Sequence, residues 1–330
     1  MQRTLPICIC SALLTTTAVH AAQPAAKPAV SYPTKPIRIV VTYPPGGPTD
    51  IVARAVGQKL TEAWAQPVVI DNRAGAGGIV GTEVVARAVP DGYTLLLGTS
   101  AGLAINPALN SKLPYNAFTD FAPISLIVIN PQILVFNASF APNSVKELIQ
   151  FAKARPGQIN YASVGPGSPN HLGMELLKSM AGIDIVHIPY KGTSPAVTDL
   201  LTGQVSLMFN SMPSVLPQVR AGKLKGIAVG SAKRSQAAPE IPTVAEAGVP
   251  GFEYVTWYGL FAPAATPKEI VAKLHGEMVR MLGERELAQR FASQGAEPAS
   301  TTPAELAKFM RAEHERWKQV IKSGRIKVDS

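Results

Sequence analysis

Two similar corners in the sequence carry the residue types that bind anions. Residues 43–50 read Tyr-Pro-Pro-Gly-Gly-Pro-Thr-Asp, and residues 163–171 read Ser-Val-Gly-Pro-Gly-Ser-Pro-Asn-His. In each corner a strand-like run ends in a Gly/Pro loop, and a proline then stands where a helix would begin. Glycine lets the backbone approach a ligand closely, and the free amides of a first helical turn attract negative charge. The pair therefore predicts a clamp that holds one anion from two sides.

The polar residues of these corners also have structural interpretations. Ser168 is a good N-cap for its own helix, Asp50 complements a helix dipole, and His171 suits a hydrogen-bonded core position. A helix N-terminus contributes about 0.3–1 kcal/mol to anion binding, so hydroxyl side chains must add hydrogen bonds to the clamp. Both interpretations stay open for each residue, and the pairing of the corners favours ligand binding.

A third segment, residues 98–102, reads Gly-Thr-Ser-Ala-Gly and matches the nucleophile elbow of serine hydrolases. No oxyanion segment of the HGGG type precedes it. Beyond residue 22 the chain has four histidines, His171, His187, His275 and His314. We favour a Ser100 that faces a ligand from a strand-to-helix loop and keep an exported serine hydrolase as the alternative.

Motifs for cofactors and metals are weak. The glycine-rich residues 75–81 follow the second predicted strand rather than the first, and Asp91 further on lies in a Pro-Asp-Gly turn, so we interpret them as a tight turn. The sequence contains no P-loop, no H-E-x-x-H and no clustered His/Asp set. We therefore expect no cofactor, no metal and no enzymatic activity.

Composition excludes several classes of protein. The chain has 330 residues, of which 46% are hydrophobic and 16% charged, so it buries a sizeable core rather than remaining disordered. Lys and Arg exceed Asp and Glu by 31 to 22, a formal charge of +9. These cations are scattered, with no basic run and little aromatic interleaving, so we expect steering of anions rather than nucleic-acid binding.

The first 22 residues have the layout of a secretory signal peptide. Arg3 precedes an apolar stretch, and small residues at Ala21 and Ala22 offer a cleavage site. Both cysteines, Cys8 and Cys10, lie inside this segment, so the mature chain has no disulfide and no thiolate site. Residues 23–31 form a flexible lead-in. We expect a protein of the bacterial periplasm.

Short strands alternate with amphipathic helices along the rest of the chain. Strands separated by helices of this length pair in parallel, which predicts an α/β sheet. The first half is expected to have strands at 37–42, 67–71 and 93–98 with helices at 48–64 and 78–89, and the second half strands at 158–162, 184–188, 205–209 and 224–229.

Two longer apolar stretches, residues 123–136 and 254–262, are expected to be strands that cross between two lobes. Capping boxes at Ser144, Thr266 and Thr302 predict three helix starts. Apolar residues at helical spacing from Leu306 to Ile321 predict a C-terminal helix that packs on the core. We predict a first, discontinuous lobe of residues 32–130 and 254–330, and a second lobe of residues 131–253.

At these corners the sequence resembles the Bug or TctC family of periplasmic solute-binding proteins of tripartite tricarboxylate transporters. The motifs, in order, cover nearly the whole mature chain. They are residues 32–38 (Tyr-Pro-Thr-Lys-Pro-Ile-Arg), 44–50 (Pro-Pro-Gly-Gly-Pro-Thr-Asp), 71–78 (Asp-Asn-Arg-Ala-Gly-Ala-Gly-Gly), 90–95 (Pro-Asp-Gly-Tyr-Thr-Leu), 189–192 (Pro-Tyr-Lys-Gly) and 241–246 (Ile-Pro-Thr-Val-Ala-Glu).

The resemblance implies a type II-like periplasmic-binding-protein fold, with two lobes that are each a helix-covered, mainly parallel sheet and a ligand cleft between them. It also implies which residues line the two walls of the cleft. One wall takes Pro45, Gly46, Gly47, Asp50, Thr99 and Ser100; the other takes Ser163, Gly165, Gly167, Ser168 and His171. Asn210 matches a site residue that is commonly Asp in relatives. This departure disfavours an amino-acid ligand, because a cationic amine would lose its acidic partner.

The expected function is capture of a small organic anion, a carboxylate, by lobe closure. The expected partners are that ligand and the membrane permease subunits of a tripartite tricarboxylate transporter, and the expected state is a monomer. Besides the hydrolase, a sensor that passes the binding signal to a membrane partner is kept as an alternative.

Overall fold

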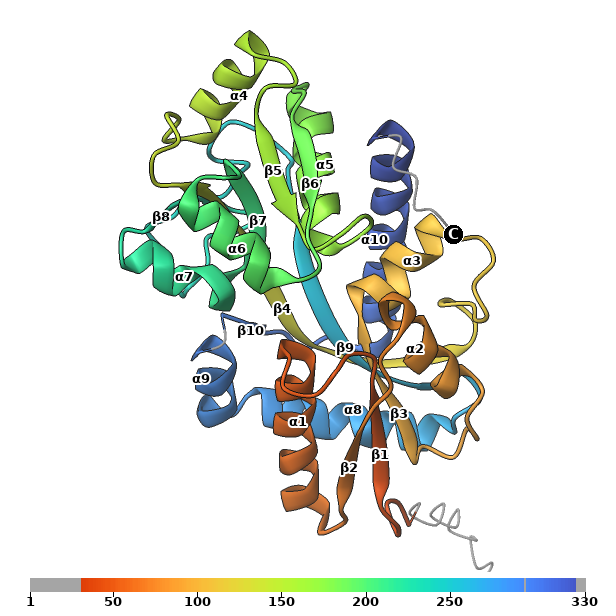
Figure 1. Ribbon diagram of the computed structural model, residues 1–330. Coiled ribbons are helices and arrows are strands. Elements are labelled where there is room, and N and C mark those ends of the chain that lie inside the picture. Colours follow the sequence, from red (N-terminus) through yellow and green to blue (C-terminus); the bar gives the residue numbers. More distant parts are fainter. Residues whose placement is uncertain (1–30, 294, 325–330) are drawn as a thin grey trace, which may run out of the picture. The chain divides into compact units, whose positions relative to one another are not determined.

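One mixed β-sheet runs through the protein in the computed structural model, which describes residues 31–293 and 295–324 (Figure 1). The chain divides into two units, Met1–Ser31 and Tyr32–Ser330, and the described helices and strands lie in the second. The strand order is β2-β1-β3-β9-β4-β7-β5-β6, and β8 and β10 also pair with β4. The strands are β1 (Ile37–Val41), β2 (Val68–Asn72), β3 (Thr94–Thr99), β4 (Phe121–Asn137), β5 (Asn160–Ser163), β6 (Val186–Pro189), β7 (Leu207–Ser211), β8 (Leu224–Val229), β9 (Val255–Pro263) and β10 (Glu297–Pro298).

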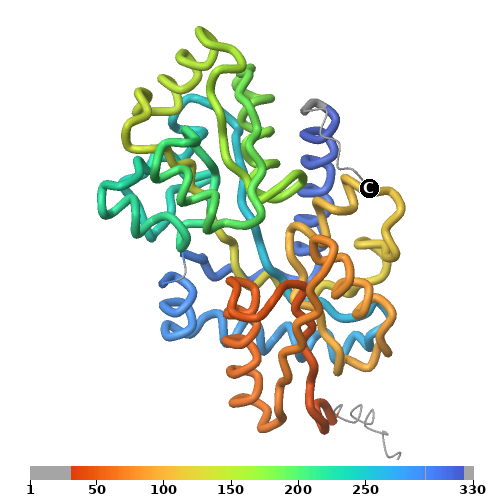
Figure 2. The backbone as a smooth tube through the Cα atoms, viewed as in Figure 1, coloured from red at the N-terminus to blue at the C-terminus, as the bar shows by residue number. Residues whose placement is uncertain are grey.

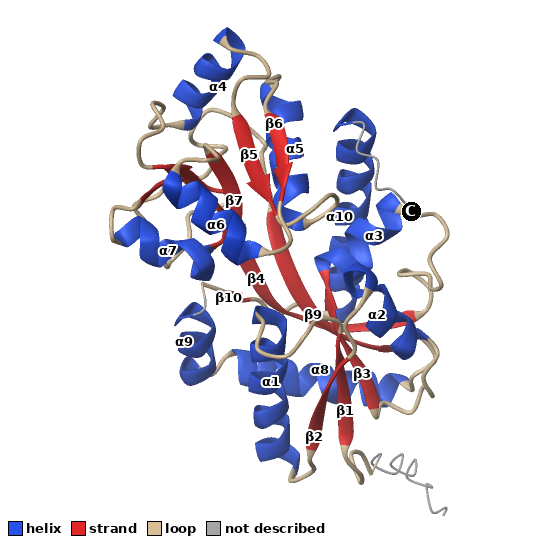
Figure 3. Cartoon of the chain, in the orientation of Figure 1, coloured by secondary structure: helices blue, strands red, loops and turns tan. Residues whose placement is uncertain are grey.

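Helices cover both faces of this sheet (Figure 3). The helices are α1 (Pro48–Trp64), α2 (Ile79–Ala86), α3 (Asn106–Leu109), α4 (Val145–Ala154), α5 (Pro169–Ala181), α6 (Thr193–Thr202), α7 (Met212–Arg220), α8 (Lys268–Leu282), α9 (Arg285–Ser293) and α10 (Pro303–Gly324), with short turns η1 (Ala76–Gly78) and η2 (Ala101–Ile105). None of these described helices is long and apolar enough to cross a membrane.

Strands β4 and β9 connect the two halves of the sheet, as the apolar stretches predicted. They run antiparallel and side by side, although they are far apart in the sequence (Figure 2). From Phe121 to Pro131, β4 pairs with β9; from Gln132 to Asn137 it pairs with β7 on one side and β8 on the other. β4 therefore changes its partners at Pro131 and Gln132.

In the first half of the sheet, β1 and β3 are mostly buried on both faces, whereas the edge strand β2 has Val69 53% exposed. Ile39 and Leu95 belong to one core with Val56 of α1 and Leu274 of α8. The alternate residues, Val40 of β1 among them, belong to the other core, which includes residues of α2, η2 and α10. β1, β2 and β3 pair in parallel, whereas β9 joins β3 antiparallel.

The second half repeats this arrangement with other helices. Met208 of β7 lies in a core with residues of α6 and α7, and its neighbour Phe209 lies in a core with residues of α4 and α5. β5 pairs in parallel with β6 and β7. The predicted crossovers are thus present in both halves, and the antiparallel pairs come from β4 and β9.

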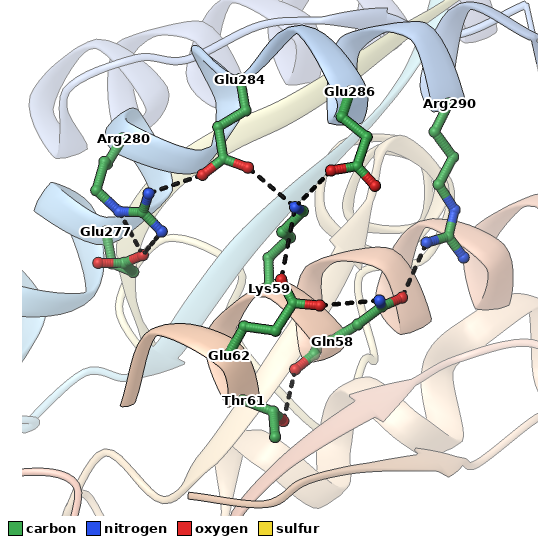
Figure 4. A network of polar contacts seen from close by, with 10 residues as sticks. Gln58, Lys59, Thr61, Glu62, Glu277, Arg280, Glu284, Glu286 and Arg290 are labelled. Atoms are coloured by element: carbon green, nitrogen blue, oxygen red, sulfur yellow. Dashed lines mark hydrogen bonds and ion pairs between the residues drawn. The ribbon is translucent and has the colours of Figure 1, made fainter. Parts of the chain in front are cut away.

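An ion-pair network attaches the helices after β9 to α1 (Figure 4). Lys59 Nζ lies 3.0 Å from carboxylate oxygens of both Glu284 and Glu286. Arg280 contacts Glu284 at 2.7 Å and Glu277 at 2.6 Å. The contacts of Lys59 join α1 to residues more than 200 positions further along the chain, whereas those of Arg280 are local.

Of the three predicted capping boxes, the one at Thr302 is complete and the one at Ser144 is half formed, with Glu147 Oε2 accepting from Asn143 N–H at 2.8 Å. Ser144 Oγ accepts from Glu147 N–H at 3.2 Å, and Thr302 and Glu305 each accept from the other's backbone N–H. The prediction for Thr266 was wrong: α8 has Pro267 at its N-cap, and the buried Thr266 hydroxyl has no hydrogen-bond partner among the described residues. Thr266 N–H instead closes a turn onto Pro263 O at 3.0 Å.

Helix α10 packs on the core as its periodicity predicts, and it buries a carboxyl group. Glu313 is 1% exposed. Its Oε1 lies 3.0 Å from Arg316 Nη1, yet neither carboxyl oxygen has a hydrogen-bond partner among the described residues. Burial raises the pKa of Glu313, and Arg316 opposes the shift only in part. A carboxyl whose pKa is raised in the fold lowers the free energy of unfolding at any pH where the same carboxyl is ionised in the unfolded chain.

Replacing this group tests that cost. Glu313→Gln is expected to raise the free energy of unfolding by about 1 kcal/mol at pH 8, because the amide keeps the shape and removes the cost of holding a carboxyl protonated in the fold while the unfolded chain ionises. The gain should vanish near pH 4, where both states are protonated. Urea unfolding at both pH values measures it, with Glu315→Gln on the exposed face of α10 as the matched control. A loss of stability at pH 8 would mean that Arg316 holds Glu313 ionised.

Candidate functional site

The first predicted corner joins β1 to α1. Gly46 has a φ of +81°, which favours glycine, and Gly47 caps α1 with no side-chain hydrogen bond. The Asp50 side chain is 3% exposed and accepts hydrogen bonds from Gly46 N–H at 3.0 Å, Arg54 Nε at 2.8 Å and Asn72 Nδ2 at 3.0 Å. Burial alone raises the pKa of Asp50, but these hydrogen bonds outweigh it and hold the pKa below its usual value. The carboxylate of Asp50 therefore anchors its own loop.

The second corner joins β5 to α5. Gly165 and Gly167 have φ values of +122° and +72°, so both positions favour glycine. Ser168 is the N-cap of α5: its hydroxyl accepts from His171 N–H at 3.4 Å and donates to Gly165 O at 2.6 Å. The capping interpretation of Ser168 is thus present in the structure, and it leaves a contact with a ligand untested.

A column of three stacked rings lies beneath this second loop. The rings of Tyr161 and His187 lie 5.0 Å apart, and those of His187 and His171 lie 4.1 Å apart. His171 Nδ1 accepts from Gly167 N–H at 3.0 Å. Ser163 Oγ lies 2.6 Å from His187 Nε2 and accepts from Gly165 N–H at 3.0 Å. Two amides of the loop are therefore held by groups within the protein.

Tyr161 and His171 of the column are buried and His187 is half-buried, and the pKa values of both histidines are lowered. Burial, and next the neighbouring His187, lower the pKa of His171 to about 4. Burial also lowers the pKa of His187. At the far end, Glu175 Oε1 accepts from Tyr161 Oη at 2.6 Å and lies 2.7 Å from Lys178 Nζ. Both imidazoles are consequently neutral near pH 7.

Three other predicted residues lie buried at strand ends. Thr99 Oγ1, at the end of β3, accepts from Gly102 N–H at 3.2 Å. Asn210 Oδ1, near the end of β7, accepts from Ser211 N–H at 2.8 Å and lies 3.4 Å from Asn170 Nδ2. Ser100 is 2% exposed and begins the η2 turn.

The histidines that a serine hydrolase would need all have other hydrogen-bond partners among the described residues. Besides the two ring histidines described above, His275 Nε2 lies 3.1 Å from Thr301 O, and His314 Nδ1 lies 3.3 Å from Ala104 O. All four histidines therefore hydrogen bond to groups other than Ser100.

A cavity of about 650 Å³ brings the two corners together. It is lined by Tyr43, Ala76, Gly77, Ile79, Ala101, Asn106, Leu109, Asn110, Val164, Pro166, Gly167, Ser168 and Pro169. Of the predicted site residues, Gly167 and Ser168 line it. The others, namely Pro45, Gly46, Gly47, Asp50, Thr99, Ser100, Ser163, Gly165, His171 and Asn210, lie outside its lining.

Two tyrosines form a polar group beside this cavity. Burial, then the nearby Tyr258, raise the pKa of Tyr43 to about 12, and a hydrogen bond with Thr99 offsets part of the shift. Burial also raises the pKa of Tyr258, partly offset by a hydrogen bond with Thr49. Both phenols therefore keep their protons at neutral pH and remain available as donors. No group of metal-ligating side chains is present among the described residues.

Sequence comparison identifies the family. Residues 52–326 match the pattern of the tripartite tricarboxylate transporter family receptor, TctC. The chain belongs to this family. It is 40% identical over 293 residues to the protein BugT of Bordetella pertussis, a match that covers 88% of this chain and 90% of BugT.

Solved structures of TctC-like proteins share the fold. R. palustris Rpa4515 with adipate has a TM-score of 0.79 at 37% identity and covers 90% of this chain and 99% of its own. MatC (Rpa3494) from Rhodopseudomonas palustris, with bound malate, has a TM-score of 0.74 at 34% identity and covers 88% and 100%. The resemblance and the two-lobed α/β periplasmic-binding-protein fold are thus confirmed.

Membership of the TctC family makes the chain a receptor of the periplasmic type. The predicted signal peptide, its cleavage site near Ala21 and most of the predicted lead-in lie outside the described residues.

Sequence reasoning did not identify the wall of the cavity that α3 provides. Apart from the strand-to-helix loop at Ser100, no element was given bounds within residues 99–120, although Asn106-Pro107 is a helix-start signal. Asn106 Nδ2 donates to Gly77 O at 3.1 Å and ties α3 to the η1 turn. Tyr43 was part of the first corner, but its ring was not predicted to line a cavity. The long-range contact between α3 and η1 carries no local signal.

Proposed function

We propose that this TctC-family receptor captures a small organic carboxylate in the periplasm and delivers it to the permease subunits of a tripartite tricarboxylate transporter. The observation that carries the proposal is the cavity that Tyr43, from the first corner, lines together with Gly167 and Ser168, from the second. Adipate in Rpa4515 and malate in MatC are the carboxylates of its solved relatives. The proposed role is capture and delivery of the ligand without a chemical reaction.

Hydrogen-bond donors favour an anion at the first corner. The N-terminus of α1 has no side-chain cap, and its first-turn amides supply partial positive charge. The neutral phenol of Tyr43 adds a donor, and bridging waters add further hydrogen bonds. All twelve residues predicted to bind stay within this proposal, with Asp50, Ser163 and His171 acting through the loops that they hold.

Lobe closure is proposed to pivot on β4 and β9. We place the lobe boundaries at residues 130/131 and 253/254, because β4 exchanges β9 for β7 and β8 at Pro131 and Gln132. Gln132 Nε2 donates to Thr256 Oγ1 at 3.2 Å across the two strands. This arrangement supports hinge closure around a ligand, with the protein working as a monomer.

A thermal-shift panel of carboxylates and amino acids tests the function. A ligand at 100 times its Kd is expected to stabilise the protein by about 2.7 kcal/mol. At roughly 2–4 °C per kcal/mol, the Tm should rise by several degrees. A shift confined to carboxylates supports the proposal, and zwitterionic amino acids serve as the control. A flat panel, repeated after unfolding and refolding to remove any co-purified ligand, would contradict it.

A further inference from the structure

Helix α10 contacts both halves of the molecule. It packs against η2 and α3 of the first half and against α5 of the second (Figure 1). The chain just before α10 is fixed to β4, because Leu126 N–H donates to Thr301 Oγ1 at 3.1 Å and Thr301 N–H donates to Ser125 Oγ at 3.2 Å. Further along α10, His314 Nδ1 lies 3.3 Å from Ala104 O of η2. The helix is therefore anchored in the first half, and its contacts with α5 must change when the second half rotates.

An arginine of α10 holds the chain at the proposed lobe boundary, residues 253/254. Arg316 Nη1 donates to Glu253 O at 3.0 Å, and Arg316 Nη2 donates to Glu253 Oε2 at 3.3 Å. Glu253 follows Phe252, whose ring stacks on Phe209 of β7 with the centroids 5.8 Å apart. Arg316 thus joins a helix anchored in the first half to a residue positioned by the second.

The next residue, Tyr254, lies where several segments cross. Its N–H donates to Gly230 O at 2.7 Å, and Gly230 N–H donates to Gln132 O at 2.7 Å. A Cβ at Gly230 would collide with Tyr254 O, and a Cβ at Gly173 of α5 would collide with the Tyr254 ring. That ring also packs edge-on against Trp317 of α10, with centroids 5.8 Å apart. The crossing strands and both helices therefore meet at one tyrosine.

Buried polar groups between α10 and β9 lack fixed partners. Tyr254 Oη, Trp257 Nε1 and Trp317 Nε1 have no hydrogen-bond partner of good geometry among the described residues, and neither do the carboxyl oxygens of Glu313. All four residues are at most 1% exposed. Buried polar atoms are nearly always paired, so each exception needs an explanation. A contact that changes its pairing when the helix shifts against β9 explains why the exceptions gather here.

From these contacts we propose that α10 is a third element of the hinge beside β4 and β9, and that Arg316 is a positioning residue, which holds Glu253 and so stabilises the arrangement in which both corners line one cavity. Neither Arg316 nor Glu253 lines that cavity. The apparent affinity of a receptor falls with the population of its binding-competent state, so Arg316 acts on binding without touching the ligand. This inference rests on the proposed function and adds a residue that sets its affinity.

Arginine variants test this role with adipate as the probe. Arg316→Gln is expected to weaken adipate binding about fivefold, mainly through faster dissociation, because the hydrogen bonds to Glu253 are lost. Arg316→Lys keeps the charge and should weaken binding only about twofold. Arg280→Gln is the matched control: it loses contacts with Glu277 and Glu284, which lie in the first half, and should bind as the wild type does. Stopped-flow association and dissociation rates measure the effect.

Spin labels measure the arrangement of the halves without a ligand. Val69→Cys on β2 and Val186→Cys on β6 place labels at exposed positions on the two ends of the strand order, in a background of Cys8→Ser and Cys10→Ser. Double electron–electron resonance gives the distribution of label separations. In Arg316→Gln we expect fewer molecules at short separations than in the wild type, both with and without saturating adipate. Arg280→Gln should match the wild type.

The outcomes separate this inference from the proposed function. The side chains of Arg316 and Glu253 are 30% and 39% exposed, so the variants are expected to fold, and circular dichroism and the Tm check this. Label distributions and adipate rates equal to those of the wild type in Arg316→Gln would overturn the inference and leave the proposed function standing. Equal effects in Arg280→Gln would also overturn it. If no carboxylate of the thermal-shift panel binds the wild type, the proposed function fails, and the ligand-free distributions still decide the role of Arg316.

Discussion

Asp50→Ala is expected to lower the free energy of unfolding by about 2–3 kcal/mol and to weaken ligand binding at least tenfold. The substitution leaves Gly46 N–H and Asn72 Nδ2 without the acceptor that each has in the structure. Losing one member of a buried, hydrogen-bonded charge pair costs about 3–5 kcal/mol, and Arg54, which is half exposed, recovers part of this by hydration. Urea unfolding and calorimetric titration with the tightest carboxylate of the panel measure the two effects.

The pH dependence of the free energy of unfolding shows whether the ionised carboxylate of Asp50 stabilises the fold. Because the pKa of Asp50 is lowered in the fold, its stabilisation is present above the usual carboxyl pKa and is lost as the pH falls through the lowered value. Wild type and Asp50→Ala should therefore converge in strong acid. Asp50→Asn, which keeps one acceptor oxygen, is expected to lose about half as much stability. Unchanged stability with lost binding in Asp50→Ala would assign the carboxylate to the ligand instead of the loop.

Local patterns in the sequence predict most elements of this fold. Pro48 and the apolar periodicity predicted α1 at its observed bounds, and the β8 prediction also matches the structure. Capping shows where local signals fail. Thr266 and Thr302 both begin a Thr-Pro-x-Glu run, but Thr266 is buried and its N–H is held by a turn onto Pro263. Tertiary contacts therefore determine which of two identical local patterns forms a helix cap.

The candidate site was predicted less completely, because its roles depend on distant partners. The two corners were visible as loop and helix-start patterns. That Asp50 anchors its loop depends on Asn72, which lies at the end of another strand. The stack of His171 on His187 and Tyr161 joins α5 to β5 and β6, and no spacing in the sequence indicates it. Residue types predict a chemistry for the corners, whereas the sheet determines which atoms meet.

Acid is expected to destabilise the fold through His171. Between pH 6.5 and 4 the His171 ring is protonated in the unfolded chain but stays neutral in the folded protein, because folding lowers its pKa to about 4. The unfolded state then binds more protons, so the free energy of unfolding falls as the pH falls. This difference between the pKa values of His171 in the unfolded and folded states corresponds to a loss of free energy of unfolding on the order of 2–3 kcal/mol by pH 4. Glu175, Lys178, Tyr161 and His187 are the ionisable groups that face the ring.

His171→Asn isolates this contribution, since the amide oxygen takes the place of Nδ1 as acceptor for Gly167 N–H and does not titrate. Urea unfolding from pH 7.5 to pH 4 should give the variant a shallower loss of stability than the wild type. His171→Phe keeps the ring stack but leaves the amide without an acceptor, so it should be the less stable variant at pH 7.5. Coinciding pH profiles for wild type and His171→Asn would contradict a neutral, buried ring.

Ligand binding should also depend on the protonation state of His171. Gly167 lines the cavity and its N–H is held by the unprotonated Nδ1 of His171, so protonation of that ring removes the acceptor that orients the loop. In the wild type, the affinity for the tightest carboxylate should therefore fall as the pH approaches 4. In His171→Asn it should fall less over the same range, because the acceptor persists. Protonation of the free carboxylate affects both proteins equally, so the difference between the two profiles reports the loop alone.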